Sequence, residues 1–78
     1  MANVTIYSTP TCGFCKMTKA FFKENNIEYT DKDVAQDAAA QKEMVDKSGQ
    51  FGVPVIVIDD QIVVGFDKAK LTSLLNIK

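Results

Sequence analysis

The first third of the chain changes from strand-like to helix-like spacing of its apolar residues. A short run of β-branched and aromatic residues, Val4 to Tyr7, predicts a buried strand that stops before Pro10. Beyond it, apolar side chains recur every three or four residues from Gly13 to about Asn25, at Phe14, Met17, Phe21 and Phe22. This spacing is typical of one face of a helix, so we expect a strand followed directly by a helix.

The middle of the chain predicts a second strand and a second helix. Ile27 to Thr30 is strand-like, although acidic residues interrupt its pattern. Asp37 to Ser48 is rich in alanine, with Met44 and Val45 on one face. Gly49 follows at the position where helices often end in a left-handed residue. A strand and then a helix are therefore expected here.

The last third predicts a hairpin and a final helix. Two apolar β-branched runs, Val53 to Ile58 and Gln61 to Val64, flank the acidic pair Asp59-Asp60, which indicates two antiparallel strands around a tight turn. Asp67 is a suitable N-cap for a helix. Phe66 and Leu71 would form a hydrophobic staple around that cap, and the core-facing positions would be Leu71, Leu74 and Leu75.

The predicted order is therefore βαβαββα, an α/β fold. The first βαβ unit implies two parallel strands, and the hairpin adds two more, which gives a four-stranded mixed sheet flanked by three helices. In this layout the segment from Cys12 onward lies at the edge of the sheet, beyond the C-terminal end of the first strand.

Length and charge limit the possible functions. A chain of 78 residues buries too little surface for two cores, so residues 1–78 are expected to form a single domain. The net charge of -1, with lysines scattered along the chain, argues against nucleic acid as a partner. The longest apolar stretch is too short to cross a bilayer, and no leader pattern precedes the first strand, so we expect no membrane partner and a cytoplasmic location.

Both cysteines lie in one short segment and therefore cannot join distant parts of the chain. A zinc site needs four ligands, whereas the chain has two thiols and no histidine, so no metal site within one chain is expected. A cluster shared between two chains stays open as an alternative. The two cysteines could also be small buried hydrophobic residues, but a Cys-x-x-Cys pair that follows a strand and opens a helix favours redox chemistry.

Cys12-Gly13-Phe14-Cys15 places two thiols across the first turn of a helix, close enough to form a disulfide. Free N–H groups and the helix dipole favour a thiolate at Cys12. Lys16 and Lys19 are expected to add little, because both are treated as exposed and screened by solvent. The prediction is that Cys12 attacks a substrate disulfide and that Cys15 resolves the mixed disulfide.

Pro54 is the second candidate for a site residue. A proline at this point either starts a strand or forms a cis bond that leaves the Val53 backbone free to pair with a substrate, and the residues alone do not decide between the two.

The chain resembles the glutaredoxins over nearly its whole length. The motifs are Val-Thr-Ile-Tyr-Ser-Thr-Pro-Thr-Cys-Gly-Phe-Cys at the start, Gly52-Val53-Pro54, and Gly65-Phe66-Asp67 before the last helix. The resemblance implies a thioredoxin-like fold and a cis Pro54. It also implies a glutathione-dependent thiol–disulfide oxidoreductase with glutathione as co-substrate, no permanently bound cofactor, and disulfide-bearing proteins as partners.

The resemblance also implies a glutathione site, made of residues from four segments: Phe14, Gln50, Val53, Pro54, Gly65, Phe66 and Asp67. The main chain of Val53 would bind the cysteinyl part of glutathione. Free N–H groups near Asp67 would bind its γ-glutamyl carboxylate and the Asp67 side chain its ammonium group. Asp67 could instead be only a helix cap, or serve both purposes.

The sequence departs from the usual glutaredoxin pattern at several of these positions. Gly13 and Phe14 replace the family's Pro-Tyr, Thr9 replaces a lysine, and Gln50 replaces an arginine of some relatives. Two alternatives therefore accompany the glutathione hypothesis. One is a redoxin that a flavoprotein thioredoxin reductase reduces and that donates electrons to ribonucleotide reductase. The other is an iron–sulfur cluster carrier, against which the retained Cys15 argues.

Overall fold

The computed structural model describes residues 3–75 and has the predicted order βαβαββα. The elements are β1 (Val4–Ser8), α1 (Gly13–Glu24), β2 (Thr30–Asp33), α2 (Ala38–Ser48), β3 (Val55–Ile58), β4 (Gln61–Val64) and α3 (Lys68–Leu74). The strands form one mixed sheet in the order β2-β1-β3-β4, with β1 parallel to β2 and antiparallel to β3, and β3 antiparallel to β4. The predicted α/β architecture is confirmed.

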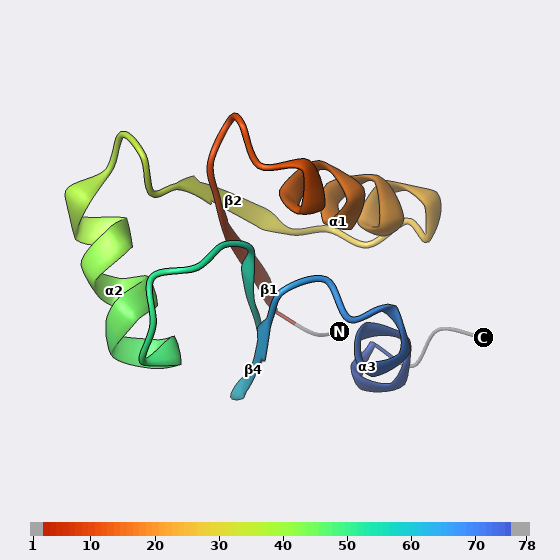
Figure 1. The fold of residues 1–78 in the computed structure, drawn as a ribbon. Coiled ribbons are helices and arrows are strands. Elements are labelled where there is room, and N and C mark those ends of the chain that lie inside the picture. The colour runs from red at the N-terminus through yellow and green to blue at the C-terminus, as the bar shows by residue number, and fades with distance from the viewer. Residues whose placement is uncertain (1–2, 76–78) are drawn as a thin grey trace.

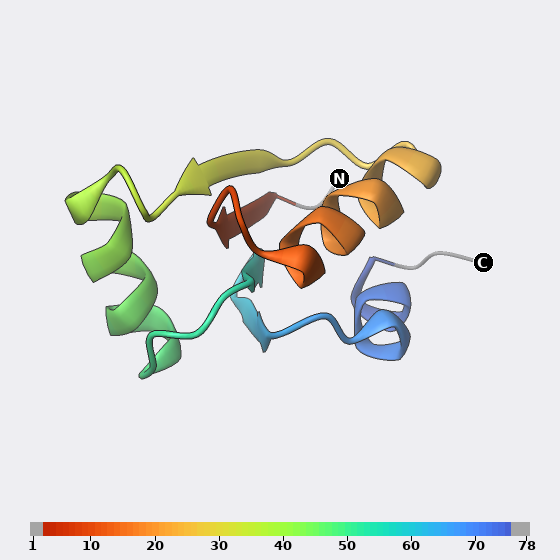
Figure 2. The ribbon, with the colours of Figure 1, turned by 45° about the horizontal axis from the view of Figure 1, so that its top comes forward.

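The sheet lies between two helical layers. Figure 1 shows α2 on one side of the sheet and α1 with α3 on the other, and Figure 2 shows the same separation from a second direction. Strand residues alternate between these layers, as the two-residue period of a strand requires. Ile6 and Ile56 face α1 and α3, together with Phe22 and Leu71.

The opposite face of the sheet packs on α2. Tyr7, Val55 and Met44 form the centre of this second cluster. The Tyr7 hydroxyl donates to Glu43 on α2, and Lys32 on β2 forms an ion pair with the same carboxylate at 2.9 Å. Polar contacts thus add to apolar packing in holding α2 against β1 and β2.

The second strand lies three residues later than the pattern predicts. Ile27 and Tyr29 are apolar because they pack against the core beside α1, not because they belong to a strand. The strand itself is Thr30–Asp33, an edge strand without apolar residues whose position is set by pairing with β1, Thr5 opposite Thr30 and Ser8 opposite Asp33. Apolar alternation therefore cannot locate it.

The predicted ends of the helices are confirmed. Asp37 and Asp67 cap α2 and α3, and each side chain accepts a hydrogen bond from the backbone N–H three residues later. Gly49 ends α2 with a φ of 73°, a left-handed conformation that favours glycine. Phe66 and Leu71 both pack in the cluster beneath α3, as the expected staple requires.

Candidate active site

Cys12 lies between β1 and α1, beyond the C-terminal end of a central strand, as predicted. It is the N-cap of α1, and its backbone N–H donates to the carbonyl of Thr9 at 3.3 Å. Its Sγ accepts a hydrogen bond from the backbone N–H of Cys15 at 3.2 Å and is partly exposed. A donated N–H and the positive end of the helix dipole both stabilise negative charge on this sulfur.

Cys15 occupies the opposite environment, with none of its surface exposed. Burial raises its pKa from 9.0 to about 12, and its hydrogen bond with Cys12 adds to the effect. A backbone hydrogen bond from Thr9 and the positive charge of Lys19 act against this rise in pKa. At neutral pH Cys15 is therefore a protected thiol, whereas the Cys12 sulfur is partly exposed and accepts an N–H hydrogen bond.

The apolar face of α1 is not the predicted one. Phe14 and Met17 are 61% and 51% exposed, and the buried positions are Cys15, Thr18, Phe21 and Phe22. Cys15, Thr18 and Phe22 recur at helical spacing, so Cys15 belongs to the inward stripe of the helix. Phe14 and Met17 instead lie on the surface of α1.

Val53 and Pro54 lie close to Cys12. The Val53–Pro54 peptide bond is cis, which confirms the expectation drawn from the resemblance. The Cys12 thiol can donate to the Val53 carbonyl, which is 3.9 Å away. Within residues 3–75, the Val53 N–H has no hydrogen-bond acceptor. A main-chain donor without an intramolecular partner is thus available close to Cys12.

Gly65, Phe66 and Asp67 connect this region to α3. Gly65 has a φ of 82°, and its N–H donates to the Pro54 carbonyl at 2.8 Å, so the two loops are joined directly. Phe66 packs edge-on against Phe21 at 6.0 Å between ring centroids. The Asp67 side chain caps α3 through Oδ1, which accepts a hydrogen bond from the backbone N–H of Lys70 at 3.1 Å. Among residues 3–75, the second oxygen of Asp67 has no hydrogen-bond partner.

Gln50 forms its bonds within its own loop. Its Oε1 accepts from the Gly52 N–H at 2.6 Å, and its Nε2 donates to the Gly52 carbonyl and to Ser48. These bonds shape the loop that carries Val53. A direct contact between Gln50 and glutathione stays a prediction, as does that of Phe14.

One exposed aromatic was not identified from the sequence. Phe51 is 73% exposed in the loop before Val53. The sequence signal for this exposure was its position between Gly49, which ends α2, and Pro54. An aromatic residue in such a loop, outside any helix or strand, is not placed to pack in the core. Together with Phe14 and Met17 it leaves large apolar surface on the segments that flank the thiols.

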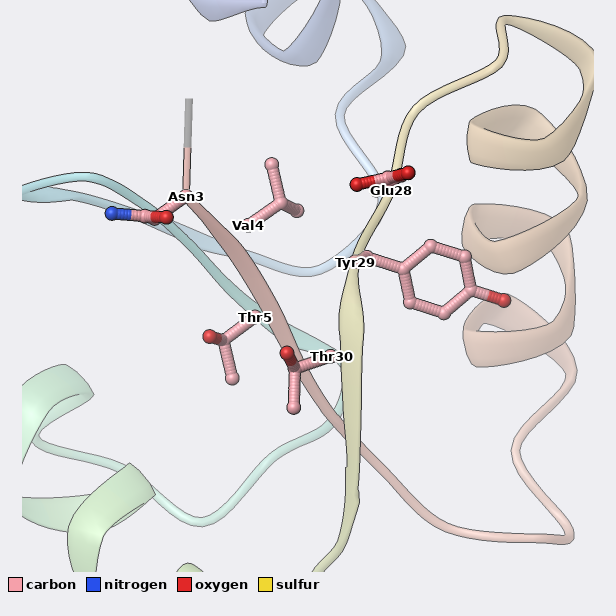
Figure 3. A pocket seen from close by; sticks show the side chains of 6 residues that line it. All are labelled: Asn3, Val4, Thr5, Glu28, Tyr29 and Thr30. Carbon is pink, nitrogen blue, oxygen red and sulfur yellow. The ribbon is translucent and has the colours of Figure 1, made fainter. Parts of the chain in front are cut away.

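A shallow pocket of about 420 Å³ lies at the other end of the sheet. Figure 3 shows its lining, which comes from the first residues of β1 and β2 and the residues just before each strand: Asn3, Val4, Thr5, Glu28, Tyr29 and Thr30. It shares no residue with the thiol site. Over residues 3–75, no helix is long and apolar enough to cross a membrane, and no group of three or more potential metal ligands occurs.

Comparison with known proteins decides the family. The glutaredoxin family model matches residues 4–63 of the 78, a span that includes both cysteines and Pro54. The chain belongs to the glutaredoxin family. Membership of the glutaredoxin family assigns it thiol–disulfide oxidoreductase chemistry, in agreement with the two unlike thiols of the site.

Individual members of the glutaredoxin family are similar over most of their length. A glutaredoxin-like 8.6 kDa protein of the Clostridium pasteurianum rubredoxin operon is 50% identical over 72 residues, 92% of this chain and 96% of its own. Glutaredoxin 3 of Escherichia coli is 37% identical over 86% of this chain and 81% of its own. A crystallised mutant of a thioredoxin-like protein superimposes with a TM-score of 0.93 at 38% identity, with both chains fully covered.

Proposed function

We propose that this protein is a glutathione-dependent oxidoreductase that reduces protein disulfides and glutathione mixed disulfides through Cys12. The proposal includes a cytoplasmic location, where glutathione is kept reduced. The observation that carries it is the pairing of a partly exposed sulfur, Cys12, which accepts an N–H bond at 3.2 Å, with a fully buried second thiol, Cys15.

The proposed reaction has two steps. The Cys12 thiolate attacks one sulfur of a substrate disulfide, a new sulfur–sulfur bond forms at Cys12, and the other substrate sulfur leaves as a thiolate that takes up a proton. For a protein disulfide the second thiol is Cys15, which attacks the Cys12 sulfur, forms the Cys12–Cys15 disulfide and releases the bound half as a thiol. For a glutathione mixed disulfide Cys15 can act in the same way, or another glutathione thiolate attacks the bound glutathione sulfur, forms glutathione disulfide and releases Cys12 as a thiolate.

The proposed glutathione site follows from the positions of main-chain groups. The Val53 carbonyl lies beside the Cys12 sulfur, and the Val53 N–H has no acceptor within residues 3–75, so this residue can pair with the cysteinyl backbone of a bound tripeptide. Gly65 links the Pro54 loop to the segment before α3. The free oxygen of Asp67 supports a contact with the glutamyl ammonium group.

A second candidate is a redoxin reduced by a flavoprotein thioredoxin reductase, which would donate electrons to ribonucleotide reductase. Gln50 favours this candidate. Its side-chain amide is hydrogen-bonded to Gly52, and it is uncharged, so it does not supply the positive charge of the arginine that some glutaredoxins have at this position. The exposed Phe14 and Phe51 also suit a protein surface better than a charged tripeptide. A thioredoxin-like relative at 38% identity adds weight to this candidate.

Two coupled assays separate the candidates. NADPH consumption would be followed with a glutathionylated peptide plus glutathione and glutathione reductase, and separately with an insulin disulfide plus thioredoxin reductase alone. Turnover in the first assay supports the glutathione proposal. Turnover in the second assay alone overturns it in favour of the reductase-linked redoxin. Cys12→Ser is the blank for both assays, since it removes the nucleophile and leaves the other reagents unchanged.

A further inference from the structure

The burial of Cys15 creates a requirement for the resolving step. Cys15 must attack as a thiolate, yet burial in the reduced protein holds its pKa near 12. Its interaction with Cys12 contributes to this value, and that part disappears once the Cys12 sulfur is in a mixed disulfide. The burial remains, so a favourable charge close to Cys15 would accelerate the step.

Lys19 is the least exposed of the three lysines of α1. It lies four residues after Cys15, one helical turn along the same face, whereas Lys16 and Lys23 are exposed. The expectation that both lysines are exposed and screened by solvent holds for the exposure of Lys16 and is wrong for that of Lys19. The Lys19 side chain is only 26% exposed, and its Nζ lies 2.6 Å from Oδ2 of Asp31 on β2.

A third residue holds this ion pair. The Ser8 hydroxyl, on a residue only 2% exposed, donates to Oδ1 of Asp31 at 2.7 Å. One carboxylate oxygen of Asp31 thus forms an ion pair with Lys19, and the other accepts a hydrogen bond from the Ser8 hydroxyl. Ser8 immediately precedes Thr9, whose backbone reaches the Cys15 sulfur. The end of β1, the edge strand β2 and the first turns of α1 therefore meet next to the resolving thiol.

We propose that Lys19, held in place by Asp31 and Ser8, is a positioning residue for the resolving step, where its ammonium group stabilises the thiolate that Cys15 becomes. The inference rests on the dithiol route of the proposed function. Cys15 loses its proton and its sulfur attacks Cys12 Sγ. The Cys12–substrate bond breaks, and the leaving thiolate takes up a proton. The products are the Cys12–Cys15 disulfide and a free thiol, so no further oxidant or reductant is needed.

The other titratable groups around this pair are few. Cys12 acts on Cys15 from the start of the helix, and Asp31 and Tyr29 act on Lys19 from β2 and the segment before it. Asp31 raises the pKa of Lys19, as does Cys15, so Lys19 stays charged throughout the pH range in which the thiols react. Lys19 therefore keeps its positive charge while Cys15 loses its proton in the resolving step.

Stopped-flow kinetics with the disulfide DTNB test the inference without glutathione. In the first phase, Cys12 attacks DTNB and releases one coloured thiolate at a rate that depends on DTNB concentration. In the second phase, Cys15 attacks the mixed disulfide at Cys12 and releases a second coloured thiolate at a rate that does not depend on DTNB concentration. For Lys19→Gln we expect the second phase to slow about three- to tenfold at neutral pH and its pH profile to move upward. The first phase should stay within about twofold of wild type.

Two matched variants make the result decisive. Lys23→Gln removes an exposed charge of the same helix and should leave both phases unchanged. Lys19→Arg keeps the charge and should restore most of the second phase. The inference is overturned if Lys19→Gln resolves like wild type, if Lys23→Gln slows the second phase equally, or if Lys19→Arg is as slow as Lys19→Gln. A missing second phase in the wild type would instead refute the dithiol route itself.

Discussion

The Val53 carbonyl oxygen lies 3.9 Å from the Cys12 sulfur, although 41 positions separate the two residues in the sequence. The contact brings the loop before β3 to the start of α1, so a disulfide that reaches Cys12 meets main-chain groups of Val53 at once. A substrate can thereby be held by its backbone, which suits a protein that accepts disulfides in different sequence contexts.

Replacement of the nucleophile should remove all disulfide reduction. In Cys12→Ser the hydroxyl cannot act as a thiolate, and the remaining thiol, Cys15, has none of its surface exposed. We expect turnover no higher than in the same coupled assays without added protein, while circular dichroism shows a folded variant. Measurable reduction of any disulfide by this variant would show that Cys12 is not the nucleophile.

Replacement of the resolving thiol should separate two activities. In Cys15→Ser, a mixed disulfide with a protein substrate has no intramolecular thiol to resolve it, so reduction of protein disulfides should be lost. Removal of glutathione from a glutathionylated peptide should survive in part, because a second glutathione can attack the glutathione sulfur bound to Cys12 and release Cys12 with glutathione disulfide as the product. The two assays measured side by side test this. Loss of both activities in a folded variant would argue against the glutathione route.

Much of this site can be predicted from the sequence, because the positions of its residues depend on the segments directly before and after them in the chain. Cys12 follows a strand and opens a helix, and the Asp67 cap lies just before an apolar helical stripe. The Lys19–Asp31 pair could not be predicted, since it requires the register of β2. That strand carries no apolar pattern and is placed by its pairing with β1. The exposure of Met17 was missed because Cys15 and Thr18, not only large apolar residues, form the inward stripe of α1.

Alkaline pH should destabilise the reduced protein through Cys15. Because its pKa is raised from 9.0 to about 12 in the folded state, both states carry the proton below pH 9. Above that pH the unfolded chain ionises while the folded chain does not. The free energy of unfolding should therefore fall as pH rises, by up to about 1.4 kcal/mol per pH unit from this thiol.

Urea unfolding of reduced wild type and Cys15→Ala between pH 7.5 and 10.5 measures this effect. The variant loses packing at every pH, but its stability should decline less steeply above pH 9. The buried Tyr7, whose pKa is also raised, is present in both proteins, and its contribution cancels in the comparison. Parallel declines in the two proteins would contradict a buried, protonated Cys15.

Two substitutions at Asp67 should separate its role as a cap from its proposed role in glutathione binding. Asparagine caps helices about as well as aspartate, so Asp67→Asn should keep the stability of wild type, whereas Asp67→Ala should lose about 1 kcal/mol. Both remove the negative charge proposed to meet the glutamyl ammonium group. Each should therefore raise the glutathione KM about three- to tenfold, a modest factor because the residue is exposed. Steady-state kinetics with varied glutathione, together with urea unfolding, provide both quantities. If Asp67→Asn matches wild type in KM and stability alike, Asp67 serves only as the cap of α3, and the exposed Phe14 and Phe51 become the better guide to what this surface binds.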